Sequence, residues 1–486
     1  MAYKHGVYNT EQATSLTVPI QGNAGLQVIF GTAPIHLAKD PAAAVNTPKL
    51  VYSYKEAVEA VGYSDDFENF TLCQSISACF QVFNVAPIIL VNVLDPNKAA
   101  HVTQNQAESC DVVDGVVLYD KKYVLLNTLA VKNGSAILVA GSDYEAAHED
   151  NGSVAITLLS TAAKEASSLT VSSTSLKPSG VTAADIVGGV DASTGKETGL
   201  ELIRQIYPTL GMVPGLILAP GWSHTPTVAA ALQAKTENIN GNFNYSCLLD
   251  ISADSDGAVV YTSVKGAKEA LGASSAHAAA LWPMVAVGEK KYYFSAMFAA
   301  LTAYTDANNA DVPYESPSNK DLRITATVLK DGTTVALDQQ QANDVLNANG
   351  VITAINANGF KSWGNNTAAY PSTTDPKDRW WAVRRFFDWD GNNFIQTYFQ
   401  KVDKPGNKRL IQSIVDSQNI IGNGYVARDY CAGYRVEFRS DENPVTNLLA
   451  GHLTVHTYLA PYIPAEYIEN IREYDVDALE SAIGGE

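Results

Sequence analysis

The sequence of 486 residues contains few cysteines, and none has the paired spacing of a zinc site. They stand at Cys73, Cys79, Cys110, Cys247 and Cys431. Isolated cysteines of this kind are typical of reduced, mostly buried thiols. The eight histidines are scattered as well, without an H-E-x-x-H pair. The sequence therefore predicts no local metal site, and we expect no cofactor.

Long apolar runs are also missing. No stretch of about twenty apolar residues occurs anywhere, and residues 1–7 lack the apolar segment of a signal peptide. We therefore expect no direct membrane insertion. We also expect a protein that stays in the cytosol in which it is made, unless it is exported whole.

Basic residues are scarce, since 33 Lys and Arg face 51 Asp and Glu for a formal net charge of −18. A charge of this sign opposes binding to phosphate backbones, so we expect no nucleic-acid partner. One local exception follows Arg384 and Arg385 and consists of Lys401, Lys404, Lys408 and Arg409, called the basic patch below. It is either a solvated helix junction or a docking surface for an acidic partner.

No nucleotide-binding or calcium-binding motif is complete. The loop 188–197 resembles a phosphate-binding loop, but Gly189 and Gly195 are one residue too far apart and Glu197 replaces the magnesium-binding Ser or Thr. Segment 388–393 resembles a calcium loop, but Asn393 stands where glycine is required. The first segment is better explained as a loop that enters a helix, and the second as helix capping by Asp390 or Asn392.

A catalytic triad is not recognisable either. Ser223 and His224 adjoin the end of an expected strand, yet sequence neighbours point in different directions and no acidic partner can be identified. We therefore expect no catalytic residues and no enzyme.

The chain does contain enough apolar residues, 46%, to bury large cores, and its length suggests about three domains. Strands and helices alternate before residue 97 and again after residue 185, which predicts parallel strands with crossover helices. Between these parts, short β-like runs separated by turn formers predict an inserted β domain. The expected fold is a multidomain combination of α/β and α+β: a mixed α/β core, a β-rich insert and a C-terminal α+β domain. The predicted divisions are an N-terminal arm 1–22, a core 23–96 and 186–335, an insert 97–185, a C-terminal domain 336–452 and a C-terminal arm 453–486.

Several local signals predict where elements begin and end. Ser53 and Glu56 have capping-box spacing, and Asp338 caps a helix that ends at Gly350. A helix is expected over 197–207, and a hairpin over 322–337. The helix after residue 409 is expected to stop at the glycines of 422–424.

Both ends of the chain have the alternating pattern of an unpaired strand. The N-terminal arm carries Tyr8, Thr10, Leu16, Val18 and Ile20; the C-terminal arm carries Leu453, Val455, Leu459, Tyr467 and Ile468. Pro461 and Pro464 prevent the C-terminal segment from being a central strand of its own sheet. We expect both arms to add strands to other subunits, in heterologous contacts that build rings or filaments.

Several stretches, in this order, resemble contractile tail sheath proteins of phages, phage-tail-like bacteriocins and related injection systems. The matching stretches are 186–191, 214–221, 281–284, 316–319, 363–364 and the tail from 443 to 466. The resemblance covers most of the chain outside the insert.

The resemblance implies a structural subunit that stacks as hexameric rings around an inner tube, with baseplate and tail terminator proteins as further partners. It implies that the arms join neighbouring subunits, that the C-terminal domain lies near the tube, and that contraction drives the tube through a cell envelope. The basic patch would then face the tube. Such a protein would assemble in the host bacterial cytoplasm and end in a phage or tailocin particle.

Two other classes of function stay open at this point. The first is an α/β nucleotide-binding enzyme with a β insertion, which would require a glycine-rich turn with phosphate-binding geometry. The second is an exported surface-layer or adhesion protein, against which the missing export signal argues.

Overall fold

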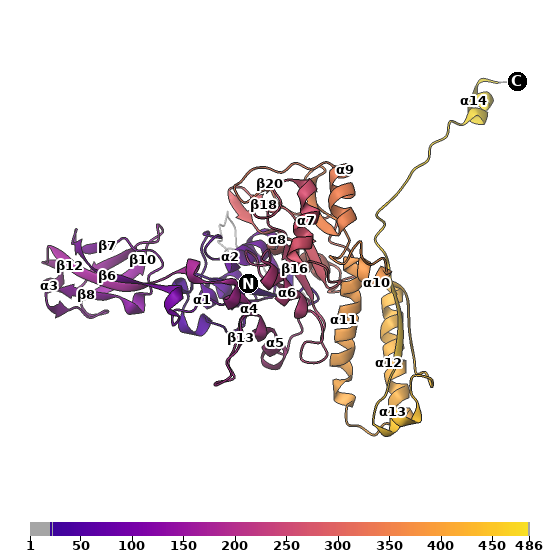
Figure 1. The fold of residues 1–486 in the computed structure, drawn as a ribbon, viewed down its shortest axis with the longest axis horizontal. Helices are drawn as coiled ribbons and strands as arrows, with labels where there is room; N and C mark the ends of the chain where they lie inside the picture. Colours follow the sequence, from indigo (N-terminus) through magenta and orange to yellow (C-terminus); the bar gives the residue numbers. More distant parts are fainter. Residues whose placement is uncertain (1–19, 22, 485–486) are drawn as a thin grey trace, which may run out of the picture.

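The computed structural model describes residues 20–21 and 23–484 of the chain. Three regions follow one another in space, with a β insert at one end, an α/β core in the middle and a pair of long helices at the other end (Figure 1). The C-terminal tail leaves the helical end and carries the short helix α14, Val476–Ile483, away from the core.

The core is built on one eight-stranded sheet. In spatial order its strands are β22 (Phe360–Trp363), β21 (Val351–Asn356), β17 (Ala278–Leu281), β16 (Ser246–Asp250), β15 (Leu216–Leu218), β2 (Gln27–Gly31), β5 (Ile88–Asn92) and β3 (Lys49–Val51). The six inner strands are parallel, and the two edge strands are antiparallel. Strands β2, β5 and β16 are buried at every residue, as expected for a parallel sheet covered on both faces. This confirms the mixed α/β architecture.

Crossover helices cover this sheet. They are α1 (Tyr54–Val61), α2 (Leu72–Ile76) with a π-helical continuation Ser77–Phe83, α4 (Ala183–Val187), α5 (Ile203–Leu210), α6 (Pro226–Ala234), α7 (Val264–Leu271) and α8 (Phe294–Asn308). Helix α8 is buried nearly all round, so its Thr302 and Thr305 hydroxyls donate to carbonyls one turn earlier. A small sheet of β19 (Lys290–Tyr292), β18 (Met284–Val287) and β20 (Ala326–Val328) lies beside it.

The insert has a hydrophobic core of its own between two sheets. One sheet contains β10 (Tyr144–His148), β11 (Val154–Leu158) and β7 (Val116–Tyr119); the other contains β6 (Val102–Asp111), β12 (Ser168–Leu176), β8 (Ala130–Asn133) and β9 (Ala136–Ile137). The short helix α3, Thr161–Lys164, follows β11. Alternate residues of β12 are buried, which is the period of a strand with one face on a core.

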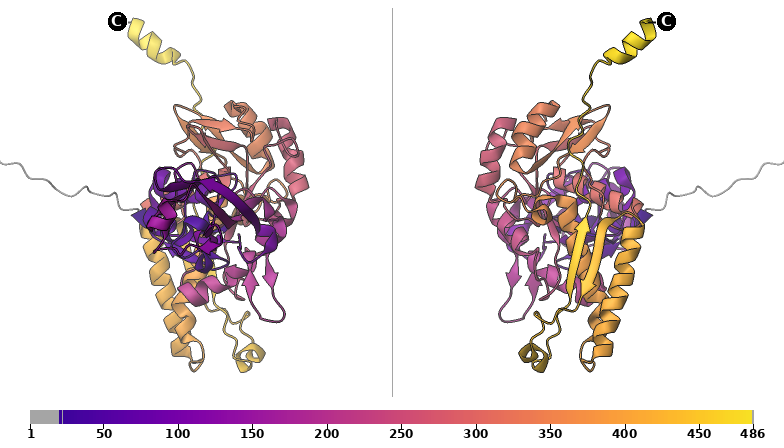
Figure 2. Two further views of the ribbon diagram at one scale, coloured as in Figure 1. Left: turned by 90° about the vertical axis from the view of Figure 1, so that its left-hand side faces the viewer. Right: turned by 90° about the vertical axis from the view of Figure 1, so that its right-hand side faces the viewer.

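The C-terminal region is a helical hairpin backed by two strands. Helices α11 (Trp381–Tyr398) and α12 (Lys408–Ala427) form the hairpin, after the short helices α9 (Gln339–Gln341) and α10 (Pro376–Arg379). Strands β23 (Cys431–Glu437) and β24 (His456–Pro461) lie beside α12, as Figure 2 shows, and α13 (Val445–Leu449) lies between them in sequence. Two further two-stranded pairs are β1 (Ile20–Gln21) with β4 (Val85–Ala86), and β13 (Gly189–Val190) with β14 (Glu197–Thr198).

Local capping signals are confirmed. Ser53 accepts the Glu56 N–H at 3.3 Å, and the Glu56 carboxylate accepts the Tyr52 N–H at 2.8 Å. Asp338 caps α9, and Gly350 ends the helical segment in the left-handed conformation. These signals depend only on nearby backbone groups, so sequence spacing suffices to find them.

Four expectations need correction. The α-helix expected from residue 197 begins only at Ile203, because β14 and a 3-10 turn precede it. The turn of the expected hairpin forms, but β20 has its ladder with β18. Helix α12 passes through the glycines of 422–424 and ends at Ala427, because α12 packs on β23 at Gly422.

The fourth correction concerns the C-terminal arm. Strand β24 pairs antiparallel with β23 of the same chain, whereas we expected a partner outside its own core. Val455 and Leu459 accordingly join an apolar cluster with Tyr434 and Val436. Intrachain pairing is possible because β23 and β24 make a separate two-stranded sheet and the prolines fall only at and beyond the end of β24.

Candidate assembly site

Ser223 and His224 each have a structural partner. Ser223 donates to Asp250 at 2.7 Å, and the same carboxylate accepts the Ser295 N–H at 2.8 Å in the first turn of α8. Burial raises the pKa of Asp250. His224 instead stacks on Tyr293, with ring centroids 5.5 Å apart. Ser223 and His224 therefore serve separate packing roles.

The place where a doubly wound sheet usually binds a ligand is filled. That crevice lies at the carboxyl ends of the strands where the strand order reverses, here between β2 and β15. The Thr71 hydroxyl accepts the Thr32 N–H at 3.2 Å, and Thr32 in turn accepts the Thr71 N–H at 3.1 Å. A Cβ atom at Gly31 or Gly221 would collide with the Thr71 side chain. This packing leaves the nucleotide-binding alternative without its usual site.

Neither incomplete motif is the helix start that we expected, because residues 189–198 form a two-stranded hairpin and residues 388–393 lie in the interior of α11. Local hydrogen bonds account for both segments. Asp191 accepts from Ser193 and Thr194 in the turn between β13 and β14. In segment 388–393, which lies within α11, Asp388 binds Arg384 and Asp390 binds Tyr434. Within residues 20–21 and 23–484, no group of three or more His, Cys, Asp or Glu side chains is arranged to hold a metal ion. None of the helices in that same part of the chain is both long and apolar enough to cross a membrane.

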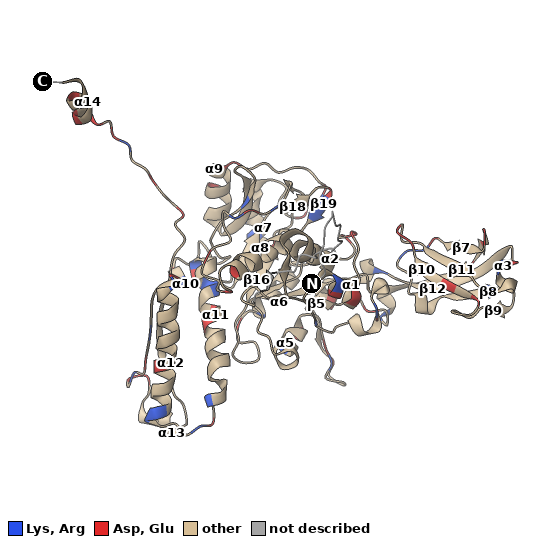
Figure 3. Ribbon diagram, turned by 180° about the vertical axis from the view of Figure 1, so that it is seen from behind, with Lys and Arg blue, Asp and Glu red and all other residues tan. Residues whose placement is uncertain are grey.

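The basic patch lies at the far end of the helical hairpin, around the turn from α11 to α12 (Figure 3). Lys404, Lys408 and Arg409 are exposed, and Lys401 is partly buried. Among the described residues, none of these four side chains has an acidic partner within 4.0 Å. The tip is therefore a local concentration of unneutralised positive charge.

Arg384 and Arg385 do not belong to this patch. They lie in the first turns of α11, at the core end of the hairpin, and both are buried. Arg384 pairs with Asp378 and Asp388, and Arg385 pairs with Asp306. Sequence proximity suggested one basic region, but an 18-residue helix separates its two ends.

The C-terminal arm changes character at its middle. Residues 456–461 are fixed by β23, whereas residues 462–475 form neither helix nor strand. Tyr467 and Ile468 are 78% and 87% exposed, and Leu453 is partly covered near the hairpin tip. In the N-terminal arm, Tyr8, Thr10, Leu16 and Val18 lie outside the described residues; Ile20 pairs with Val85 in a short parallel bridge.

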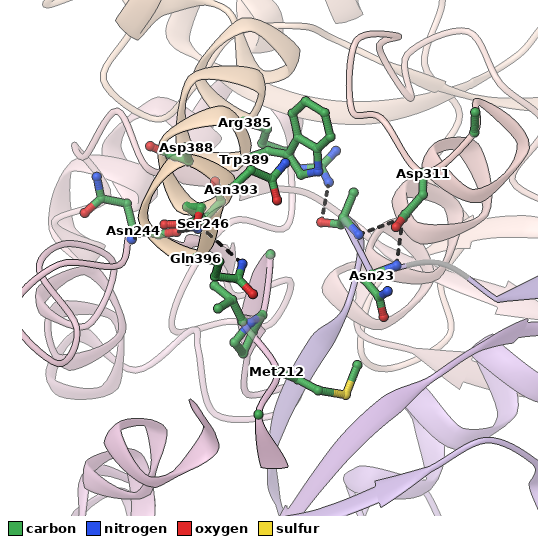
Figure 4. A pocket seen from close by; sticks show the side chains of 17 residues that line it. Asn23, Met212, Asn244, Ser246, Asp311, Arg385, Asp388, Trp389, Asn393 and Gln396 are labelled. Atoms are coloured by element: carbon green, nitrogen blue, oxygen red, sulfur yellow. Dashed lines mark hydrogen bonds between the residues drawn. The ribbon is translucent and has the colours of Figure 1, made fainter. Parts of the chain in front are cut away.

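The points where the two arms join the rest of the subunit, called the arm roots below, are held by contacts that the sequence did not predict. Ala24 is held by Asp311 and Arg385 beside a cavity of about 370 Å³, shown in Figure 4. Glu466 is held by Asn365 and Arg379. The partners are 87 to 361 residues apart in sequence, so no local spacing could have indicated them.

Comparison with known proteins reveals similarity along the chain. No family profile matches the sequence. The chain is 27% identical over 473 residues to the tail sheath protein of Burkholderia phage BcepMu, and the alignment covers 94% of each protein. It is 26% identical over 299 residues to the tail sheath protein of Escherichia phage P2, covering 59% of this chain and 69% of that protein. It is 24% identical over 302 residues to the major tail sheath protein of Serratia phage KSP20, covering 61% and 72%.

Solved structures show the same fold at low sequence identity. A chain of the anti-feeding prophage baseplate is similar with a TM-score of 0.58 and 15% identity, over 98% of this chain and 100% of that one. A chain of the PVC extracellular contractile injection system sheath complex, in the contracted state, has a TM-score of 0.56 and 14% identity, over 98% and 99%. Sequence similarity to tail sheath proteins along nearly the whole chain, together with the fold shared with chains of contractile injection systems, supports a contractile tail sheath protein, a structural subunit.

Proposed function

We propose that the chain polymerises through its two arms into hexameric rings that stack helically around an inner tube. Contraction of this sheath would drive the tube through a cell envelope. The observation that carries the proposal is the sheet of β23 and β24, which has only two strands among the described residues and therefore an open edge on each side. Open edges of this kind accept an extended segment of another chain.

The C-terminal tail supplies a segment suited to such an edge. Beyond Glu466 it exposes Tyr467, Ile468, Ile471 and Tyr474, each at least two-thirds exposed. A stretch with so much exposed apolar surface is typical of a segment that a partner covers. Addition to a neighbouring copy in one direction gives a heterologous contact, which repeats into rings and helices.

The comparisons support partners beyond the chain itself. One similar chain belongs to a baseplate, and another to a sheath complex in a contracted state. We extend this to the present chain: self-association, a baseplate partner at one end of the sheath, a tail terminator at the other and a tube inside. The subunit would assemble in the host bacterial cytoplasm and end in a phage or tailocin particle.

Contraction of such a sheath requires no nucleotide hydrolysis by the subunit. If contraction buries an extra ~400 Å² of apolar surface per subunit, the gain is on the order of 10 kcal/mol before opposing terms. Summed over many subunits, this energy suffices for mechanical work. The extended sheath would be a metastable state held by its baseplate and tube.

Electron microscopy of the purified chain, alone and with its tube protein, tests this function. We expect long hollow cylinders from the full chain. Deleting residues 1–19, or residues 467–486, should abolish the cylinders and leave the melting temperature of the core nearly unchanged. A chain that remains monomeric at high concentration with its tube present contradicts the proposal, and unchanged cylinders from both deletions contradict the role of the arms.

We propose further that the basic patch contacts the tube, because its charge is unneutralised on an otherwise acidic chain. Changing Lys401, Lys404, Lys408 and Arg409 to Glu should reduce co-sedimentation with the tube without affecting self-assembly. A matched control changes four exposed lysines of the insert, Lys122, Lys132, Lys164 and Lys177, which alters the net charge equally. Equal loss in both variants would show that net charge, and not the patch, governs attachment.

A further inference from the structure

The root of the N-terminal arm is held by buried charges. The Asp311 carboxylate accepts the backbone N–H groups of Asn23 and Ala24, both at 2.7 Å. Arg385, labelled in Figure 4, donates to the Ala24 carbonyl at 3.3 Å. Arg385 also forms an ion pair with Asp306. Arg385 and Asp306 are only 3% and 1% exposed, so this anchor lies inside the protein. The chain is therefore fixed in position just before it enters β2.

The root of the C-terminal arm is held by a second arginine. The Glu466 carboxylate accepts from Asn365 at 3.1 Å and lies 3.5 Å from the Arg379 guanidinium. Arg379 is itself positioned by the rings of Tyr370 and Trp380, whose centroids lie 4.6 and 4.0 Å from the guanidinium carbon.

Asn365 and Arg379, which bind Glu466, are oriented by further hydrogen bonds. Ser316 donates to Asn365 at 2.6 Å, and Arg379 donates to Asn366 at 3.0 Å. These bonds do not involve Glu466. The carboxylate of the tail therefore meets a site whose donors are already oriented.

Both arginines belong to one short stretch of chain, residues 376–388. Arg379 ends α10, and Arg385 lies near the start of α11. Between them, Arg384 donates to Asp378 at 3.1 Å and to Asp388 at 2.9 Å, so the stretch is cross-linked internally. Asp388 also lies 2.9 Å from His277, which stands just before β17 and fixes the stretch to the central sheet.

We propose that residues 376–388 form a brace that fixes the roots of the two arms relative to each other. On the proposed function, on which this consequence rests, each subunit is linked to neighbours through both arms. A brace between the arm roots makes the subunit rotate as one body during contraction, so that bending is confined to the tail beyond Glu466. Glu466 is then a positioning residue: it sets where the C-terminal arm leaves the subunit.

Distances between spin labels on the full-length chain test the brace. Labels at Asn23→Cys and Tyr467→Cys, in a Cys110→Ser background and diluted with unlabelled protein, report the separation of the two roots. We expect one narrow distance distribution. Glu466→Ala should broaden it to about twice its width or more, because the tail then samples the reach of a free peptide. Glu466→Gln, which keeps an acceptor for Asn365, should restore most of the narrow distribution.

Two further variants make the test decisive. Glu469→Ala removes an exposed carboxylate three residues later that has no hydrogen-bond or ion-pair partner in the described part of the chain, and it should leave the distribution unchanged. Asp311→Ala should broaden the distribution from the N-terminal side. If Glu466→Ala leaves the width unchanged, the brace is refuted.

The outcome is separable from that of the proposed function. If the parent chain forms cylinders but Glu466→Ala leaves the width of the distance distribution unchanged, the brace alone is refuted. A narrow, Glu466-dependent distribution without any cylinders would refute the sheath function alone. In assembled sheaths, Glu466→Ala should give a wider spread of helical rise and twist than Glu469→Ala.

Discussion

Helix α12 packs on strand β23 at a residue without a side chain. A Cβ atom at Gly422 would overlap the ring of Tyr434, while the same atom at Gly424 would meet open space. The Tyr434 hydroxyl donates to Asp390 at 2.9 Å and accepts from Gln418, so its ring cannot easily move aside. Two glycines two residues apart in one helix therefore have opposite roles.

This difference gives a paired prediction. Gly422→Ala should lower the free energy of unfolding by about 1–3 kcal/mol, because overpacking forces the Tyr434 ring out of its position. Gly424→Ala should raise it by about 0.5–1 kcal/mol, because alanine favours the helix without a clash. Urea unfolding of both variants measures the two changes. Equal effects of both substitutions would contradict the packing role of Gly422.

Asp390 makes the stability of the helical hairpin depend on pH. Burial raises the pKa of Asp390 to about 6, and the Tyr434 hydroxyl opposes that shift. An acid with a raised folded pKa contributes stability that is present below about pH 4, its unfolded value, and is lost as the pH rises through about 6.

Asp390→Asn should remove this dependence. We expect the variant to match the parent near pH 4 and to be more stable at pH 7 by roughly 1–3 kcal/mol, because the neutral amide has no ionisation to oppose. Thermal unfolding between pH 4 and 7 measures the difference. Asp416→Asn, at an exposed position of α12, is the control and should show no such trend.

At the scale of elements, the insert is joined to the core by a cluster of rings. His36 follows β2, and its ring centroid lies 5.1 Å from that of His148 at the end of β10. Tyr123 and Phe70 complete the cluster, and Tyr123 donates to Asp66 of the core at 2.6 Å. The insert also has its own apolar core, which supports the proposed division at residues 97 and 185.

A fall in pH should destabilise this contact between the insert and the core, called the joint below. Burial and the neighbouring charge of His148 lower the pKa of His36 to about 3, and burial lowers the pKa of His148. A histidine with a lowered folded pKa contributes stability that is present above its unfolded value of about 6.5 and is lost as the pH falls toward 3, on the order of 4 kcal/mol for His36 over the whole range.

Protease sensitivity of the insert at pH 7 and pH 5 measures this effect. We expect cleavage near residues 102 and 176 to increase at pH 5 in the parent chain. His148→Phe keeps a ring at the joint and should reduce the increase, whereas His452→Gln, at an exposed histidine, should not. Identical behaviour of the three chains would show that the joint does not titrate.

At the scale of the whole molecule, we expect electrostatics to affect contacts between subunits and contacts with the tube differently. The subunit carries a net charge of −18, whereas the hairpin tip is basic. Self-association of acidic subunits is opposed by repulsion, which salt screens over about 8 Å at 0.15 M ionic strength. Attachment of the tip to an acidic tube would instead be weakened by salt.

Salt should therefore act in opposite directions. Raising the ionic strength from about 0.01 to 0.15 M should increase cylinder formation, as followed by light scattering, because the Debye length falls from about 30 to 8 Å. The same change should reduce binding of isolated subunits to the tube in co-sedimentation. A parallel response of both assays would contradict separate electrostatic roles.

Much of this organisation follows from local sequence. The apolar runs of β2, β5 and β16 predict buried parallel strands, and the period-2 texture of 97–185 predicts a β insert. Capping at Ser53 and Asp338 is equally local. The predicted helix end at 422–424 was wrong, because helix propensity does not include the packing of Gly422 against the Tyr434 ring of the next strand.

The sequence by itself determined the class of fold, and it predicts the position of the insert and the extended character of the C-terminal segment, because these depend on residue periods and on proline. Only the tertiary structure decided that β24 pairs within its own chain, that Arg384 and Arg385 are buried away from the basic patch, and that Glu466 meets Arg379. Such contacts join residues far apart along the chain, and their energy depends on geometry that no local pattern contains.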